Sequence, residues 1–281
     1  MGILLGAVAA FVWGCAGVAG GLAARRLGAR QTLAWSMLLS VIVAVPLALL
    51  SGAPGDLSPI NLLGLVTVAT GGLSGLMLVY AAMRLGNISV VTPISAAYGG
   101  VAAILSVLTG QTLTTTAMLA LAAAVIGAVL ASRGESSTPG LANARPGLSA
   151  LLAGGAAIAW GVQLFVGGEI GEAVGQSWVV AFMRMAGVIV ITLPLALRRE
   201  LVFDKQALPL VAIAGIGEVA GFTLYLLASR YGIAEASVMT SQYGTVAAVI
   251  GVVILRERLQ AIQLLGIAII VVAVAALALA G

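Results

Sequence analysis

Hydrophobic runs follow one another along almost the whole chain, separated by short polar segments. Each run is long enough, at about 20 residues, to cross a hydrocarbon layer of roughly 30 Å as an α-helix. The pattern predicts ten transmembrane helices, at residues 3–24, 31–50, 59–83, 88–109, 114–132, 148–170, 176–197, 207–229, 233–254 and 260–280. We therefore expect an all-α integral membrane protein. The longest connection, 133–147, is rich in Ser, Pro and Gly and is typical of a linker.

Composition supports a bilayer as the solvent for most of the outer surface. Hydrophobic residues make up 62% of the chain and charged residues 8%, whereas a soluble domain carries about a quarter charged residues. Cys15 is the single cysteine and histidine is absent, so we expect no metal site and no cofactor. The net charge of +4 is spread singly over segment ends, which does not indicate nucleic-acid binding. No Gly-x-x-x-x-Gly-Lys-Ser/Thr nucleotide loop is present, so we expect no nucleotide partner.

Lys and Arg residues predict the orientation, because loops on the cytoplasmic side carry an excess of them. Eleven of the 13 basic residues lie in the loops that follow the first, third, fifth, seventh and ninth predicted helices. Of the remaining two, Arg230 lies in a loop on the opposite side and Arg184 lies inside a predicted helix. We expect a multi-pass protein of a bacterial-type cytoplasmic (inner) membrane, with both termini on the outer, periplasmic side.

The chain repeats itself at an offset of about 146 residues. The matched motifs are Trp13-Gly14 with Trp160-Gly161, Pro46-Leu47-Ala48-Leu49 with Pro194-Leu195-Ala196-Leu197, Gly71-x-x-x-Gly75 with Gly217-x-x-x-Gly221, Tyr80 with Tyr225, and Tyr98-Gly99 with Tyr243-Gly244. They predict two five-helix repeats, 1–132 and 148–281, joined by the linker 133–147. Because five is odd, the second repeat must be inverted relative to the first. Inverted repeats around a central cavity are typical of transporters that work by alternating access.

These motifs resemble those of the drug/metabolite transporter superfamily, in its ten-helix EamA-like branch. The segment Arg256-Glu257-Arg258-Leu259-Gln260-x-x-Gln263-x-x-Gly266 is similar to the Glu-x-Leu…Gln…Gly pattern of that branch. The chain departs from the branch at Gln111, where Glu is frequent, and in helix 2, which lacks an arginine. The resemblance implies a central cavity lined by helices 1, 3, 4, 6, 8 and 9. It also implies export of amino acids, sugars, purine metabolites or cationic drugs, and YddG-like amino-acid and metabolite exporters look most similar.

Glu218 is the strongest single candidate for a functional residue. A carboxylate near the middle of a transmembrane helix is energetically costly unless it is paired, neutralised or in contact with water. Two functional roles fit that depth: binding the cationic part of a solute, or taking up and releasing a proton. The alternative is a structural ion pair with Arg184, which lies at similar depth in the preceding helix. Arg184 is equally open to binding a solute carboxylate.

Other candidates for substrate binding or cavity lining lie on matching helices of the two repeats. They are the aromatic residues Trp13, Trp160, Tyr80, Tyr98, Tyr225 and Tyr243, and the polar residues Gln163, Ser95, Ser241 and Gln242. Taken singly, each polar residue is as well explained by a hydrogen bond between helices. Pro93 is a candidate hinge, since it removes a backbone hydrogen bond from its helix. Gly71, Gly75, Gly217 and Gly221 are expected at close helix crossings.

We therefore expect a secondary transporter that exports amino acids or similar small metabolites by alternating access. Export of cationic drugs, sugars or nucleosides in the same fold is an alternative, and a passive channel is an alternative of another class. An enzyme is not expected, because the deep polar residues provide no nucleophile, base or metal set. The expected partners are a small solute and the lipid bilayer, and the protein is expected to be a monomer.

Overall fold

A computed structural model describes residues 1–109, 145–256 and 259–280, together with Thr115, Leu119, Ala122, Ala123, Ile126, Gly127 and Leu130. The described residues form helices and connecting turns, with no β-strand among them. The elements are α1 (Gly2–Leu27), α2 (Ala29–Leu50), α3 (Pro59–Leu85), α4 (Ile88–Ser95), α5 (Tyr98–Leu108), α7 (Pro146–Val174), α8 (Gln176–Gly187), the π-helical turn η1 (Val188–Thr192), α9 (Leu193–Leu197), α10 (Leu208–Ser229), α11 (Ile233–Ser241), α12 (Tyr243–Val253) and α13 (Ala261–Ala280). Most of the predicted helix 114–132, most of the linker 133–147, Gln111, Glu257 and Arg258 lie outside the described residues.

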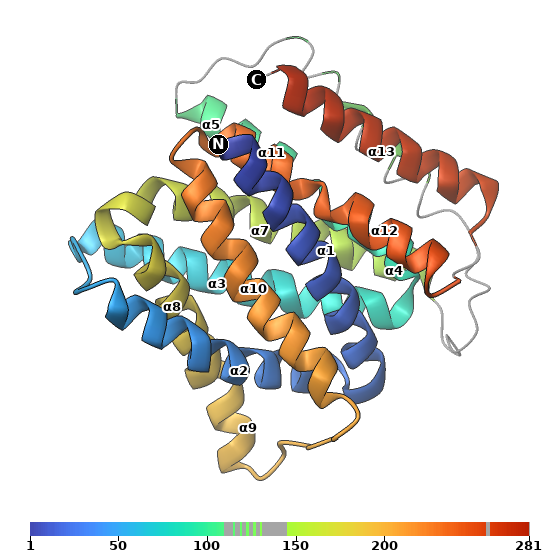
Figure 1. The fold of residues 1–281 in the computed structure, drawn as a ribbon. Helices are drawn as coiled ribbons and strands as arrows, with labels where there is room; N and C mark the ends of the chain where they lie inside the picture. The colour runs from blue at the N-terminus through green and yellow to red at the C-terminus, as the bar shows by residue number, and fades with distance from the viewer. Residues whose placement is uncertain are drawn as a thin grey trace.

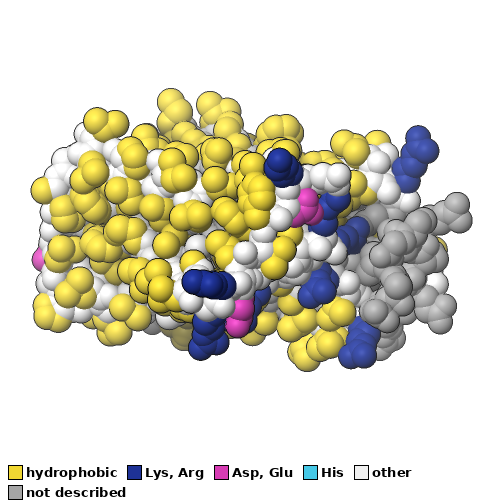
Figure 2. Space-filling view, turned by 90° about the horizontal axis from the view of Figure 1, so that it is seen from below, with side chains coloured by type: hydrophobic (Ala, Val, Ile, Leu, Met, Phe, Trp, Pro, Cys, Tyr) yellow, Lys and Arg dark blue, Asp and Glu magenta, His cyan; other side chains and the backbone are white. Residues whose placement is uncertain are grey.

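Six helices in the described part of the chain are long and apolar enough to cross a membrane. They comprise Leu4–Leu27, Ala29–Leu50, Pro59–Leu85, Pro146–Val174, Gln176–Leu197 and Leu208–Ser229. Shorter apolar helices cover Ile88–Ala102, Met239–Val253 and Ala261–Ala273. Figure 2 shows a face that is mostly hydrophobic, with Lys and Arg side chains gathered toward one side of the view. These features are those of a multi-pass membrane protein.

The helices predicted over 88–109 and 233–254 are each interrupted by a short turn. The first is broken at Ala96–Ala97, between α4 and α5, and the second at Gln242, between α11 and α12. Each break directly precedes a Tyr-Gly pair. Because the second break contains no proline, Pro93 is not the feature that the two breaks share.

The backbones cross closely at the two Tyr-Gly pairs, directly after the breaks. A Cβ on Gly99 would lie 3.1 Å from the carbonyl oxygen of Ser237, and one on Gly244 would lie 2.9 Å from that of Thr92. Glycine is therefore favoured where α5 crosses α11 and α12 crosses α4.

The predicted helix 176–197 contains one wider turn, η1, between α8 and α9. It lies directly before Pro194, which cannot donate a hydrogen bond to a carbonyl in the preceding turn. A π-helical turn accommodates such a lost bond within an otherwise continuous helix. The hydroxyl of Thr192 in this turn donates to the carbonyl of Ala34 in α2, at 2.8 Å.

The first long helix of each half packs against the third long helix of the other half. In Figure 1, α10 runs beside α1, and α3 packs against α7 in the same way. Glycines make both contacts close: a Cβ on Gly217 would lie 2.7 Å from Ala16, and one on Gly71 would lie 2.8 Å from the carbonyl oxygen of Ala159. One turn further along, Gly221 faces the indole of Trp13 and Gly75 faces that of Trp160.

Two loops bridge the halves at opposite ends of the helices. The α9–α10 loop contacts the start of α2, where the indole of Trp35 donates to the Val202 carbonyl at 2.7 Å, and the end of α1, where Arg26 pairs with Asp204 at 2.8 Å. The α2–α3 loop contacts the end of α7, where the backbone N–H of Gly55 donates to the Val174 carbonyl at 2.9 Å. Both ends are thus bridged in the same structure.

Candidate functional site

A small cavity lies between α1, α3, α5, α7, α8, α10 and α12. Its lining residues are Trp13, Gly17, Leu76, Val79, Tyr80, Met83, Tyr98, Trp160, Gln163, Leu164, Met183, Glu218 and Tyr243. The space open to the centre of a water-sized sphere is about 30 Å³, which is room for about two water molecules. Sites that hold small organic molecules measure roughly 300–1,000 Å³. In this conformation the interior of the site is too small for an amino acid.

Four aromatic rings form one wall of the cavity. Tyr98 lies 5.8 Å from Tyr243 in a stacked arrangement and meets Trp13 and Trp160 edge-on, at 6.4 Å and 6.2 Å between centroids. Trp160 also meets Tyr243 edge-on at 6.0 Å. These separations are the favourable ones for aromatic pairs. The two tryptophans and the two tyrosines come from matching helices of the two halves, as their repeated motifs predict.

Tyr80 and Tyr225, which match each other in the repeat, have different positions relative to the cavity. Tyr80 lines it from α3. Tyr225 lies behind Trp13, stacked on its indole at 6.4 Å, and its hydroxyl donates to the Leu164 carbonyl at 2.7 Å. Tyr225 therefore supports the aromatic wall and is not part of the lining.

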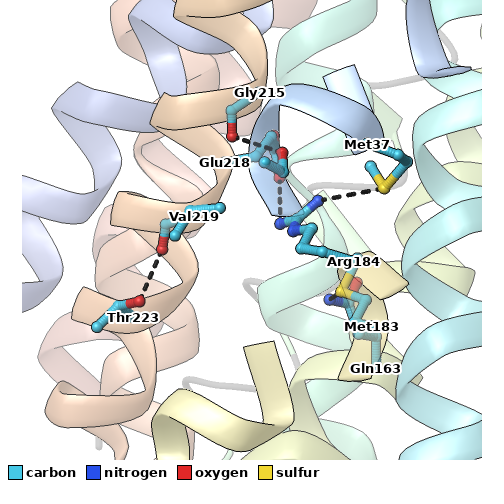
Figure 3. Close-up of polar contacts among 9 residues, drawn as sticks. Met37, Gln163, Met183, Arg184, Gly215, Glu218, Val219 and Thr223 are labelled. Carbon is cyan, nitrogen blue, oxygen red and sulfur yellow. Dashed lines mark hydrogen bonds and ion pairs between the residues drawn. The ribbon is translucent and has the colours of Figure 1, made fainter. Parts of the chain in front are cut away.

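The only buried ion pair among the described residues joins Arg184 of α8 to Glu218 of α10 (Figure 3). One guanidinium nitrogen of Arg184 lies 3.5 Å from a carboxylate oxygen of Glu218, and the other Nη lies 3.9 Å from the sulfur of Met37. The side chain of Arg184 is completely buried, whereas that of Glu218 is 14% exposed and lines the cavity. The structure thus combines two alternatives that the sequence left open: Glu218 pairs with Arg184 and also faces the cavity.

Several donors around the cavity have no hydrogen-bond acceptor within the described part of the protein. They are the indole N–H of Trp13, the hydroxyl of Tyr98 and Nε of Arg184. The Trp13 indole lies near the Glu218 carboxylate and the Tyr98 hydroxyl lies near Thr240, but neither pair meets hydrogen-bond geometry. The amide of Gln163 makes only a weak contact with the sulfur of Met183, at 3.4 Å. Buried polar groups are normally paired, so this cluster is suited to a ligand that carries acceptor atoms.

Besides Tyr225, three more predicted residues lie outside the cavity lining. Ser95 is buried against the hydroxyl of Tyr243 and supports that ring from behind. Ser241 and Gln242 line a separate small crevice that also contains Pro93 and Thr245. In this conformation they face residues of α4 and α13 in that crevice and do not line the cavity.

Six apolar or small lining residues were not predicted as site residues. They are Gly17, Leu76, Val79, Met83, Leu164 and Met183. Leu76, Val79 and Met83 share one face of α3 with Tyr80, at spacings of three, four and seven. Extending the helical stripe from Tyr80 would have found them. Apolar residues at helical spacing are also what plain packing produces, so no chemical signal distinguishes them.

The sequence profile of the EamA-like transporter family matches residues 1–133 and 147–279. The chain belongs to the EamA-like transporter family. One solved structure, titled "Crystal structure of protein", is 18% identical to this EamA-like chain with a TM-score of 0.68, over 99% of this chain and 96% of the other. That likeness shows a shared fold. No curated protein matches the chain significantly. The protein is therefore a membrane transporter of small solutes, in a family of transporters and not of enzymes.

Proposed function

We propose that the protein is a secondary transporter that exports amino acids or similar small metabolites across the cytoplasmic membrane by alternating access, in the manner of YddG-like exporters. The observation that carries the proposal is the small cavity between the two halves, which combines one carboxylate, Glu218, with an aromatic wall and apolar side chains. An amino acid needs a counter-charge for its ammonium group, hydrogen-bond donors for its carboxylate, and an apolar surface for its side chain.

The exchanged contacts of the two halves support alternating access. Trp13 against Gly221 and Trp160 against Gly75 are the same contact made twice, once from each half. We propose ten helices in two inverted repeats, 1–132 and 148–281, with the solute held where the repeats meet. The helix breaks before Tyr98 and Tyr243 lie beside this site and suit a rearrangement of its wall, with Pro93 as part of the hinge.

Glu218 has two roles open to it in this proposal. As a solute ligand, it binds the ammonium group of an amino acid. As a proton site, it takes up and releases a proton as the cavity opens to each side. The excess of Lys and Arg in the loops after the odd-numbered helices supports an outer-side location of both termini. That one chain supplies all sides of the cavity supports a monomer.

Cationic drugs are a second candidate class. Aromatic rings attract cations over their faces, and Trp13, Tyr98 and Trp160 stand beside the Glu218 carboxylate. Sugars, nucleosides and a passive channel are left as outcomes of the experiment below.

Counterflow of radiolabelled amino acids into liposomes tests the proposal, with and without a proton gradient, for the wild type and Glu218→Gln. Glu172→Gln is the matched control, because Glu172 pairs with Arg230 on the surface at 3.6 Å. Saturable exchange by the wild type and by Glu172→Gln is expected. Lost gradient-driven uptake in Glu218→Gln, with exchange and net efflux without a gradient both retained, would assign the proton role. Loss of both in a folded variant would assign binding, and conductance far above carrier rates would replace the carrier by a channel.

A further inference from the structure

The guanidinium of Arg184 is poorly satisfied for a buried charge. A structural Arg–carboxylate pair is commonly bidentate, with separations of about 2.7–2.9 Å. Arg184 instead has one 3.5 Å contact with Glu218, one 3.9 Å contact with the Met37 sulfur, and an Nε without a partner among the described residues. The pair therefore neutralises charge without filling the donor set of the arginine.

Glu218 lies between Arg184 and the cavity. Its carboxylate is part of the lining, whereas Arg184 lies behind it with no exposed side-chain surface. Tyr80, which also lines the cavity, interacts electrostatically with both charges. A rotation of the Glu218 side chain away from Arg184 would expose the guanidinium to whatever occupies the cavity.

An arginine at this depth cannot be left without a counter-ion. It stays protonated under all ordinary conditions, and breaking a buried ion pair leaves an uncompensated charge at high cost. Any step that moves Glu218 off Arg184 therefore requires another anion to arrive. A solute carboxylate is such an anion, and its planar pair of oxygens suits the unused donors of the guanidinium.

We propose that Glu218 is a built-in substitute for the carboxylate of the solute. It neutralises Arg184 while the carrier is empty, and an incoming carboxylate displaces it from the guanidinium. The inference deepens the transport function proposed above and rests on it. The site then selects solutes that carry a carboxylate, and a zwitterion gains a second contact between its ammonium group and the released Glu218.

Two further donors fit the same ligand. The Trp13 indole N–H and the Tyr98 hydroxyl are buried at the cavity without an acceptor in the described protein. The oxygens of a carboxylic acid solute would give them acceptors. The apolar side chains of Leu76, Val79 and Met83 would face the hydrocarbon part of that solute.

Two modes of leucine efflux from liposomes separate the empty carrier from the loaded one. Proteoliposomes loaded with radiolabelled leucine are diluted into leucine-free buffer for net efflux, or into unlabelled leucine for exchange. Only net efflux requires the empty carrier to return. In Glu218→Gln the empty carrier has a lone Arg184 charge, so the ratio of net efflux to exchange is expected to fall by at least about a hundredfold. In Glu172→Gln, the surface control, the ratio is expected to stay at its wild-type value.

Two additional experiments, one with acetate and one with a double variant, test the inference further. Acetate on both sides is expected to restore net efflux in Glu218→Gln, because it supplies the missing counter-ion. The double variant Arg184→Met with Glu218→Gln contains neither charge. It is expected to recover net efflux and to lose the wild-type preference for leucine over leucinamide, which lacks a carboxylate.

Three results would overturn the inference. They are an unchanged ratio in Glu218→Gln, a lowered ratio in Glu218→Gln that acetate does not restore, and a preserved preference for leucine over leucinamide in the double variant. The second result would favour a proton site at Glu218. Failure of the wild type to exchange leucine or any other amino acid would instead contradict the proposed function itself.

Discussion

At the centre of the molecule, each of two indole rings lies against a glycine of the opposite half. Trp13 packs on Gly221 of α10, and Trp160 packs on Gly75 of α3. The rings occupy space that any side chain on these glycines would fill. Glycine is needed here for close approach, because the helices are regular and φ is not positive at these residues.

Gly221→Ala is expected to destabilise the protein by about 1–3 kcal/mol, as overpacking of a tight core does. The new Cβ would lie 2.5 Å from the indole nitrogen of Trp13, and a rigid ring cannot yield without moving its neighbours. Thermal unfolding in detergent and tryptophan fluorescence measure the effect. Gly154→Ala is the control, since no atom outside its own helix lies within 4 Å of that Cβ position. Equal melting temperatures for the two variants would contradict the packing argument.

Residue identity predicted the chemistry at the site better than it predicted the geometry. Trp13, Trp160, Tyr98 and Tyr243 stand out because they repeat, and they do meet around the cavity. Repetition did not predict that Tyr80 lines the cavity while Tyr225 does not. Tyr225 stacks on Trp13 and donates its hydroxyl to the Leu164 carbonyl, whereas Tyr80 lines the cavity.

At the scale of elements, the loops between helices connect the two halves. The α9–α10 loop is held to α1 by Arg26, which donates to Asp204 and to Gln206. The pKa of the Asp204 carboxyl is held below its ordinary value, first by the backbone N–H of Gln206 and then by the Arg26 guanidinium. The ionised carboxylate therefore stabilises the folded loop.

Asp204→Asn is expected to remove a pH-dependent part of the stability. Because the pKa of Asp204 is lower in the folded state, its contribution is present above the unfolded-state value of about 3.9 and is lost as pH falls through the folded-state value. The melting temperatures of wild type and variant should differ at neutral pH and converge below about pH 4. Glu200→Gln is the control, since Glu200 meets Arg30 only at 3.9 Å on the surface. A constant difference at all pH values would show that the charge of Asp204 is not the stabilising feature.

The breaks between α4 and α5 and between α11 and α12 could not be predicted from the apolar runs. Long apolar runs predict helix, and they do not distinguish one helix from two halves joined by a turn. Pro93 offered a local reason in α4, but the equivalent break at Gln242 has no proline. What the two breaks share is the crossing at Gly99 and Gly244, which is a contact between distant segments.

At the scale of the whole molecule, the distribution of charge predicts its orientation in the membrane. Cysteine labelling in intact cells tests it, in a Cys15→Ala background. Ala53→Cys in the α2–α3 loop is expected to react with a membrane-impermeant maleimide, and Lys205→Cys in the α9–α10 loop to react only after permeabilisation. Both positions are exposed in the structure, so each serves as the accessibility control for the other. The opposite labelling pattern would reverse the proposed topology.

The amino-acid sequence alone determined that the chain is helical, spans a membrane and has two matching halves. Those properties follow from the length of apolar runs and from repeated motifs, which are local along the chain. It also predicted a carboxylate at mid-helix depth, since depth depends only on position within a helix. The tertiary structure decided that Glu218 both pairs with Arg184 and faces the cavity, that Ser241 and Gln242 do not line it, and that the cavity is too small for an amino acid in this conformation. Those outcomes depend on the rotation of each helix about its axis, which is set by side chains from the other half.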